Sequence, residues 1–219
     1  SPISFGTWIL SFFGLLSVIS FIFALTEAGV LRSPGLRRLT GALHRPESGV
    51  GALYLVVAAL WGLLLAGYTG MLIMANNAPT WSHDPFLPPL FMSSGVATAA
   101  AAIFLLSWAS GLGEASGRRR VLRTGAMALA FEAVMLLGSI VVGLGGVTPF
   151  FLGWWTALFW IVILPFGVVL PLVLLSMALF RDRELVRNAA VVGASLVLVG
   201  GILLRLLEVL GGESYYVPY

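Results

Sequence analysis

The chain has 219 residues, of which 59% are hydrophobic and only 10% are charged. An ordinary soluble domain carries about 25% charged residues, and a water-soluble protein of this size has no means of burying so much apolar surface. The composition excludes a soluble enzyme, a nucleic-acid binder and a disordered chain, and it indicates a polytopic membrane protein. The net charge of +3 is then explained by basic loops on the cytoplasmic side of a membrane.

The chain contains no cysteine, so it cannot hold a disulfide, a thiolate zinc site or an iron–sulfur cluster of its own. Its two histidines, His44 and His83, fall in segments that we expect to be loops on opposite membrane faces. A membrane haem of the b type needs axial ligands that face each other inside the bilayer. We therefore expect no cofactor bound covalently or through metal ligation.

Six stretches are long and apolar enough to cross a membrane, for which a helix needs about 20 apolar residues. Backbone groups in lipid must be hydrogen-bonded internally, so helices are expected. The sequence thus predicts an all-α helical bundle, with residues 1–219 forming a single integral membrane domain. The expected helices are 3–26, 50–75, 88–110, 124–146, 152–180 and 188–210. In the fifth stretch, Pro165 and Pro171 each remove a backbone donor, which predicts a bend.

The five loops between these helices differ in arginine content, with four, none, four, none and three arginines in chain order. The positive-inside rule therefore places the first, third and fifth loops in the cytoplasm and both ends of this chain outside. Aromatic residues that suit an interfacial belt gather toward the same outer face. They are Trp8, Trp81, Trp154, Trp155, Tyr215 and Tyr216.

Three ionisable residues, Glu132, Arg205 and Glu208, lie within the expected helices. A charge in hydrocarbon is costly and usually marks a pathway or a site. At about 1.5 Å per residue, Glu132 lies about 12 Å and Arg205 about 25 Å from the cytoplasmic side, too far apart for a relaxed ion pair. Arg205 and Glu208 are spaced i, i+3 and can pair with each other. Tyr68, about 27 Å along its own helix, shares their outer layer.

Each of these residues has a functional and a purely structural interpretation. The outer layer suits a pocket for a polar ligand head group, but snorkelling of Arg205 and Tyr68 near a helix end explains it equally well. Glu132 suits a proton relay, against the alternative of a carboxyl that only hydrogen-bonds to a neighbouring helix. Glu27 and Glu114, at the inner helix ends, suit ordinary solvated carboxylates, and they could also feed protons toward Glu132.

The loop after the second helix carries polar and aromatic residues that suit contact with another protein. His83 and Asp84 are adjacent but have no further ligands nearby, so docking of a partner is favoured over a metal site. The expected docking residues are Asn76, Asn77, Trp81, His83 and Asp84. The sequence contains no nucleophile elbow, phosphate-binding loop or metal-spacing motif.

Several segments resemble the NrfD-like family, the membrane subunits of polysulfide-reductase-type complexes. Residues 1–8, SPISFGTW, are similar to the family segment S-P-[M/I]-[S/W]-[W/F]-G-[A/T]-W. Residues 67–72, GYTGML, resemble its Y-[T/P]-G-x-L element and lead into an Asn/Pro/Trp loop at 76–81. Residues 87–91 and 203–205 also fit, so the resemblance covers nearly the whole chain in the expected order.

The resemblance implies eight or more membrane helices, of which this chain would carry the last six. It implies a subunit of the bacterial inner membrane that holds no haem or cluster and exchanges electrons and protons with menaquinone or ubiquinone. Electrons would pass through a docked iron–sulfur subunit that serves a molybdopterin or multihaem cytochrome subunit. The tyrosine of the Y-[T/P]-G element, here Tyr68, is implicated at the quinone pocket. Some relatives, in alternative complex III, are associated with a proton path instead.

Three functional hypotheses follow. The first is a quinone-reactive subunit of a respiratory oxidoreductase, which is not catalytic alone and whose pocket includes Tyr68, Arg205 and Glu208. The second is a membrane anchor or proton-conducting subunit that binds no quinone. The third is a small membrane transporter, to which the two prolines of the fifth stretch give slight support.

Overall fold

The computed structural model is built from long helices, and no strand occurs in the residues that it describes. Those residues are 2–43, 45, 47–75, 80–111, 114–145, 149–151, 153–180 and 184–213. Within them, six helices are long and apolar enough to cross a membrane. The spans are Ser4–Glu27, Gly49–Met74, Leu87–Ala109, Ala115–Gly143, Gly153–Phe180 and Asn188–Gly211. The predicted all-α membrane bundle of six helices is therefore confirmed.

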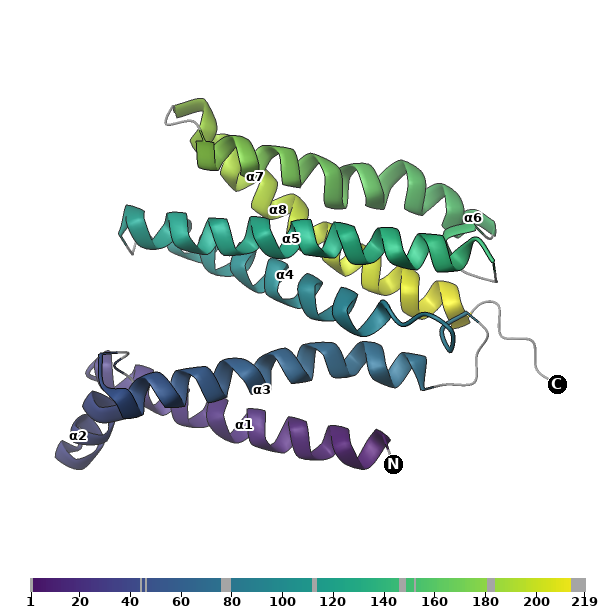
Figure 1. Cartoon of the computed structure of the whole chain (residues 1–219). Coiled ribbons are helices and arrows are strands. Elements are labelled where there is room, and N and C mark those ends of the chain that lie inside the picture. The colour runs from purple at the N-terminus through teal and green to yellow at the C-terminus, as the bar shows by residue number, and fades with distance from the viewer. Residues whose placement is uncertain are drawn as a thin grey trace. The chain divides into compact units, whose positions relative to one another are not determined.

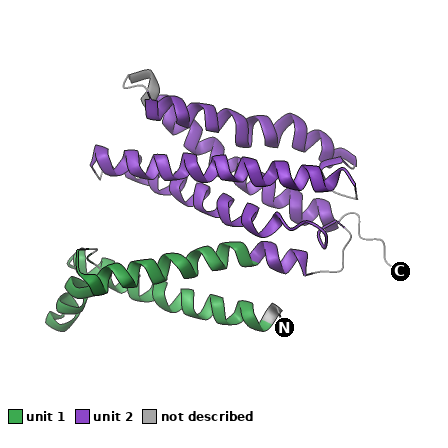
Figure 2. Ribbon diagram, viewed as in Figure 1, with its two compact units in different colours: residues 1–68 green, residues 69–219 purple. Residues whose placement is uncertain are grey.

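The chain divides into two compact units, residues 1–68 and residues 69–219 (Figure 2). The first unit contains α1 (Pro2–Glu27), α2 (Pro34–Leu43) and most of α3 (Gly49–Met74). The second unit contains the end of α3 and everything that follows it. That the whole chain acts as a single membrane domain stays a prediction.

In the first unit, α1 and α3 are linked by a small number of specific side-chain contacts. The Tyr54 hydroxyl of α3 lies 2.7 Å from the Ser20 hydroxyl and donates to the Leu16 carbonyl of α1 at 3.0 Å. Phe12 and Trp61 stack with their ring centroids 5.0 Å apart. About half of the large apolar side chains on both helices are exposed, as expected for surfaces that face lipid or neighbouring subunits.

The second unit has a buried core between four long helical segments (Figure 1). These are α4 (Leu87–Ala109), α5 (Ala115–Gly143), the segment from α6 (Gly153–Ala157) to α7 (Leu170–Phe180), and α8 (Glu184–Leu206). The short η1 (Pro149–Phe151) precedes α6. Helix α8 packs against α4 and α7, and α4 packs against α5. The core side chains between them include Leu129, Leu136, Phe159, Ile163 and Leu207.

Helix α5 begins earlier than the sequence predicts, at Ala115 instead of residue 124. The arginines expected in the third loop, Arg118, Arg119, Arg120 and Arg123, therefore lie on the first turns of this helix. Hydropathy detects only the part of a helix that crosses hydrocarbon, and a polar extension of the same helix into water gives no such signal.

The two prolines of the fifth span do not interrupt it. Pro165 lies inside a π-helix, η2 (Leu158–Val169), which joins α6 to α7, and Pro171 is the second residue of α7. A π-helix forms i→i+5 hydrogen bonds, so the local pattern adjusts around the donor that proline lacks. The sequence predicts a bend here, and the structure shows a change of helix type over 12 residues.

The closest backbone approach in the second unit joins η2 to α8. A Cβ on Gly200 would overlap the Cα of Gly167, and one on Gly167 would come within 2.9 Å of the Gly200 Cα. Small residues let membrane helices approach in this way. Because the opposing atoms belong to the backbone, they cannot move aside as a flexible side chain would.

We predict that Gly200→Ala lowers the stability of the second unit by about 1–3 kcal/mol, the usual cost of overpacking. Gly117→Ala is the matched control, because a Cβ there meets no atom within 4 Å and alanine favours a helix. Thermal unfolding in detergent measures both variants. Equal melting temperatures for Gly200→Ala and the unchanged protein would refute the close contact.

Candidate functional site

Glu132 lies at the centre of the second unit, where α4, α5 and α8 meet. Its side chain, on α5, is only 3% exposed. Ser94 of α4 faces the carboxyl, and the Arg205 guanidinium of α8 attracts it electrostatically. The Ser94 hydroxyl approaches without forming a hydrogen bond of accepted geometry, since Ser94 Oγ has no partner among the described residues. Three helices thus bring one carboxyl, one hydroxyl and one guanidinium together in an apolar interior.

The interaction between Glu132 and Arg205 agrees with the expected difference in depth. No ion pair joins the two side chains, and Arg205 Nε has no hydrogen-bond partner in the described part of the chain. Ser139, two turns from Glu132 on α5, is also buried, and its hydroxyl has no hydrogen-bond partner among the described residues. Residues seven apart lie on the same helix face, so Glu132 and Ser139 form a polar stripe in the bundle.

A second buried carboxyl belongs to Glu208, on the π-helix η3 (Leu207–Gly211) that continues α8. It is 2% exposed, and its Oε1 has no hydrogen-bond partner among the described residues. The charged group that acts on it is Asp84, whose carboxylate repels it. The expected pair with Arg205 does not form, because the helix changes type between the two residues and the i, i+3 spacing no longer places them on one face.

Two hydrogen bonds join the segment before α4 to η3 and the residue that follows it. Trp81 Nε1 donates a hydrogen bond to the Glu208 carbonyl at 2.8 Å, and Thr80 Oγ1 donates to the Gly212 carbonyl at 3.3 Å. A Cβ on Gly212 would overlap the Trp81 indole. Asp84 accepts a hydrogen bond from the Phe86 backbone N–H at 2.9 Å, which closes the turn into α4.

These contacts bury some of the expected docking residues and leave another exposed. Trp81 and Asp84 are buried, whereas His83 is exposed and lies 2.9 Å from the Ser82 hydroxyl. Asn76 and Asn77 lie outside the described residues. A docking role for this loop stays a prediction, and within the described part His83 is the docking residue whose side chain is open to a partner.

Tyr68 belongs to the first unit, and its structural partner there is Gly6. A Cβ on Gly6 would overlap the Tyr68 ring, so the glycine makes the space that the phenol occupies. Gly6 lies in the opening SPISFGTW segment and Tyr68 in the GYTGML segment, two stretches about 60 residues apart in sequence. Arg205 and Glu208 belong to the other unit, so the shared outer layer stays a prediction.

The remaining proton-path candidates are surface carboxylates. Glu27, at the end of α1, and Glu114, just before α5, are both exposed. Glu114 Oε2 accepts a hydrogen bond from the Ser116 hydroxyl at 3.1 Å. Ser94 and Thr80 also belong to the buried clusters, although the sequence pattern did not indicate them. The pair Ser93 and Ser94 inside an apolar helix is the signal that could have found the first of them.

Comparison with known proteins gives consistent matches. The family model described as "Polysulphide reductase, NrfD" matches residues 1–215. The "Protein NrfD homolog" of Haemophilus influenzae is 27% identical over 186 residues, which cover 80% of this chain and 56% of that protein. "Protein NrfD" of Escherichia coli is 29% identical over 188 residues, with 81% and 57% covered. The chain spans somewhat more than half the length of these relatives. No solved structure matches it.

We predict that Trp81→Phe loosens η3, because it removes the indole donor to the Glu208 carbonyl and some core volume, at a cost of about 1–2 kcal/mol. Hydrogen exchange of the amides in residues 207–213 should become faster. Trp154→Phe serves as the control, since Trp154 is 62% exposed. Unchanged exchange in Trp81→Phe would show that the indole does not hold this segment.

Proposed function

The chain belongs to the NrfD polysulphide reductase family, and from that premise we propose that it is the quinone-reactive membrane subunit of a respiratory oxidoreductase. It would exchange electrons and protons between a menaquinone or ubiquinone and a docked iron–sulfur subunit, in the bacterial inner membrane. Oxidation of one quinol releases two electrons and two protons, and reduction of one quinone takes up the same number. The electrons must pass to or from a partner, which would in turn serve a molybdopterin or multihaem cytochrome subunit.

The observation that carries this proposal is the contact between Gly6 and Tyr68. Two segments that resemble family motifs meet there, and the glycine of one sets the position of the phenol of the other. Tyr68 is half-buried, so its ring is held by the protein while part of it stays accessible. A quinone site needs a hydrogen-bond partner for a carbonyl oxygen beside an apolar slot for the isoprenoid tail. Tyr68 on apolar α3 supplies such a partner.

Arg205 and Glu208 take a less direct place in this proposal. The Glu208 side chain is almost wholly buried, its backbone carbonyl accepts a hydrogen bond from Trp81, and its carboxyl is repelled by Asp84. We therefore propose Tyr68 as the residue that contacts the quinone, while a quinone-binding role for Arg205 and Glu208, which belong to the other compact unit, stays a prediction. His83, on the expected outer face, is the exposed one among the described candidate docking residues, and we propose that it meets the iron–sulfur subunit.

A second candidate function, proton conduction, is favoured by the polar stripe on α5. Glu132, Ser139 and Ser94 are buried, and the two hydroxyls have no described hydrogen-bond partner. Unsatisfied polar groups inside a membrane bundle are costly and usually functional. Glu114 is an exposed carboxylate of the same unit that could pass protons toward the stripe from the arginine-rich side, and the same role for Glu27, in the other unit, stays a prediction.

Tyr68→Phe is predicted to lower quinol turnover of the purified complex about tenfold, because a missing hydrogen bond to the reacting oxygen costs about 1–2 kcal/mol. Gly6→Ala should act in the same direction by displacing the ring. Tyr54→Phe is the matched control, since Tyr54 lies on the same helix and bonds to α1. Turnover and KM for quinol that survive Tyr68→Phe unchanged would remove the tyrosine from the site.

Glu132→Gln separates the two candidate functions. If α5 conducts protons, the variant should lose proton translocation in proteoliposomes while electron transfer continues, because glutamine cannot accept and release a proton. Glu47→Gln is the control, as Glu47 is an exposed carboxylate to which we give no role. Proton translocation equal to that of the unchanged protein would leave Glu132 a structural residue.

A further inference from the structure

A cavity of about 530 Å³ lies where the first turns of α5 meet the end of α7. Its lining residues are Ser116, Arg119, Arg120, Arg123, Leu179 and Phe180. The four residues from α5 are spaced i, i+3, i+4 and i+7, the pattern of one helix face. The early start of α5 creates this face, because it places the arginines on a helix.

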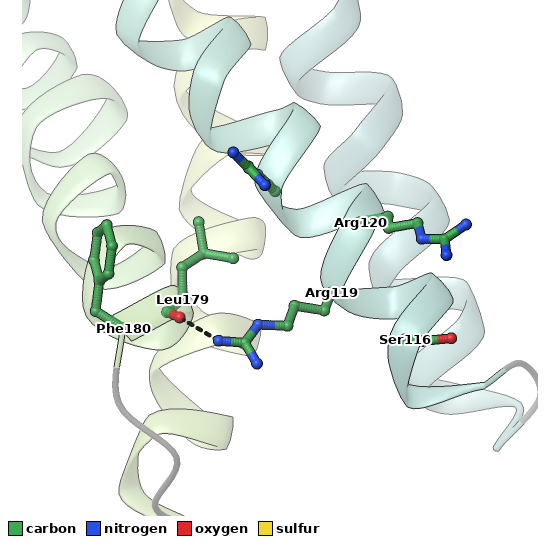
Figure 3. A pocket seen from close by; sticks show the side chains of 6 residues that line it. Ser116, Arg119, Arg120, Leu179 and Phe180 are labelled. Carbon is green, nitrogen blue, oxygen red and sulfur yellow. Dashed lines mark hydrogen bonds between the residues drawn. The ribbon is translucent and has the colours of Figure 1, made fainter.

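The arginines here are held by the fold as well as by their spacing. Arg119 Nη2 donates a hydrogen bond to the Leu179 carbonyl at 2.8 Å, near the end of α7. Figure 3 shows this bond crossing from α5 to α7 beside Phe180, with Arg120 directed away from Leu179. The bond satisfies a carbonyl at a helix end and fixes one wall of the cavity.

The cavity is strongly positive. Four arginines, Arg118, Arg119, Arg120 and Arg123, lie within two turns of α5, and among the described side chains at the start of this helix Glu114 is acidic. No hydrogen bond or ion pair joins Arg120 or Arg123 to a described residue. Guanidinium groups this close repel one another, and an anion placed among them would relieve that repulsion.

An apolar groove continues from this cavity along α7. It has a volume of about 650 Å³ and is lined by Leu172, Val173, Ser176, Met177 and Phe180. Phe180 lines both spaces and is 87% exposed. The Ser176 hydroxyl donates to the Leu172 carbonyl at 2.6 Å, so its donor is used within the helix. The basic cavity and the apolar groove thus meet at Phe180, on a helical segment long and apolar enough to cross a membrane.

We propose that this cavity and groove together bind an anionic phospholipid. The phosphate would lie among the guanidinium groups of α5, and an acyl chain would follow α7 past Phe180. Basic pockets between membrane helices on the cytoplasmic side are suited to anionic lipid head groups, and the positive-inside rule assigns this end of the bundle to that side. The site is separate from the quinone proposal, since none of its residues contributes to that function.

Native mass spectrometry of the full-length protein, delipidated in a neutral detergent, tests the proposal. Dioleoylphosphatidylglycerol should be retained in preference to dioleoylphosphatidylcholine, and inorganic phosphate should not displace it. The variant Arg120→Gln/Arg123→Gln should bind phosphatidylglycerol about 25-fold more weakly, from about fivefold for each guanidinium. Arg37→Gln/Arg38→Gln, which removes two exposed arginines from α2, should leave the binding within twofold.

Several results would overturn the proposal. They are equal retention of the two lipids, unchanged binding in Arg120→Gln/Arg123→Gln, equal losses in both double variants, or displacement by inorganic phosphate. If the first double variant does not fold, Phe180→Ala replaces it, because that exposed side chain supports no core packing. It should weaken retention of the dioleoyl lipid several-fold and leave dihexanoylphosphatidylglycerol unaffected; equal retention of the dioleoyl lipid would refute the acyl groove.

Discussion

The structure depends on the fact that hydrocarbon offers no hydrogen-bond partner to a polar group. Helices meet this constraint for the backbone, and many hydroxyls meet it by donating to a carbonyl of the preceding turn, as Thr26, Ser176 and Ser195 do. Against this background the exceptions are informative. Ser94, Ser139, Arg205 Nε and Glu208 Oε1 are buried polar groups without described partners. They are concentrated in the second unit, where an apolar core would be simpler and more stable.

The packing of that unit explains how such groups come together. Gly167 and Gly200 let α8 pack closely against the π-helix of the fifth span. Gly200 lies only five residues before Arg205. The second π-helix then begins at Leu207, and the charged group that acts on Glu208 is Asp84 instead of Arg205. Irregular helix segments often occur at functional sites, because they reposition side chains that a regular helix would keep in register. Here they separate an arginine and a glutamate that sequence spacing alone would pair.

Much of the fold could be predicted from the sequence, because hydropathy reports directly on the segments that cross hydrocarbon. The six spans and the exposed Glu27 and Glu114 follow from composition and depth. The start of α5 could not be predicted in this way, since its arginine-rich turns lie in water. Nor could the burial of Trp81, which depends on a hydrogen bond to a residue 127 positions later in the chain. The meeting of Ser94 with Glu132 depends on helix packing, about which hydropathy says nothing.

The chain is an apolar helical protein with two groups of polar side chains. In the first unit the Tyr68 phenol packs against Gly6. In the second unit Glu132 and Ser139 form a stripe of buried polar groups. We propose that the chain serves redox chemistry whose electrons travel through a partner. Electron paramagnetic resonance of the purified complex, titrated with a menaquinol analogue, tests this most directly. Cluster signals should develop when the iron–sulfur subunit is bound to this chain and be absent when that subunit is separated from it. Equal reduction of the isolated subunit, or purification of this chain without any electron-carrying partner, would contradict the account.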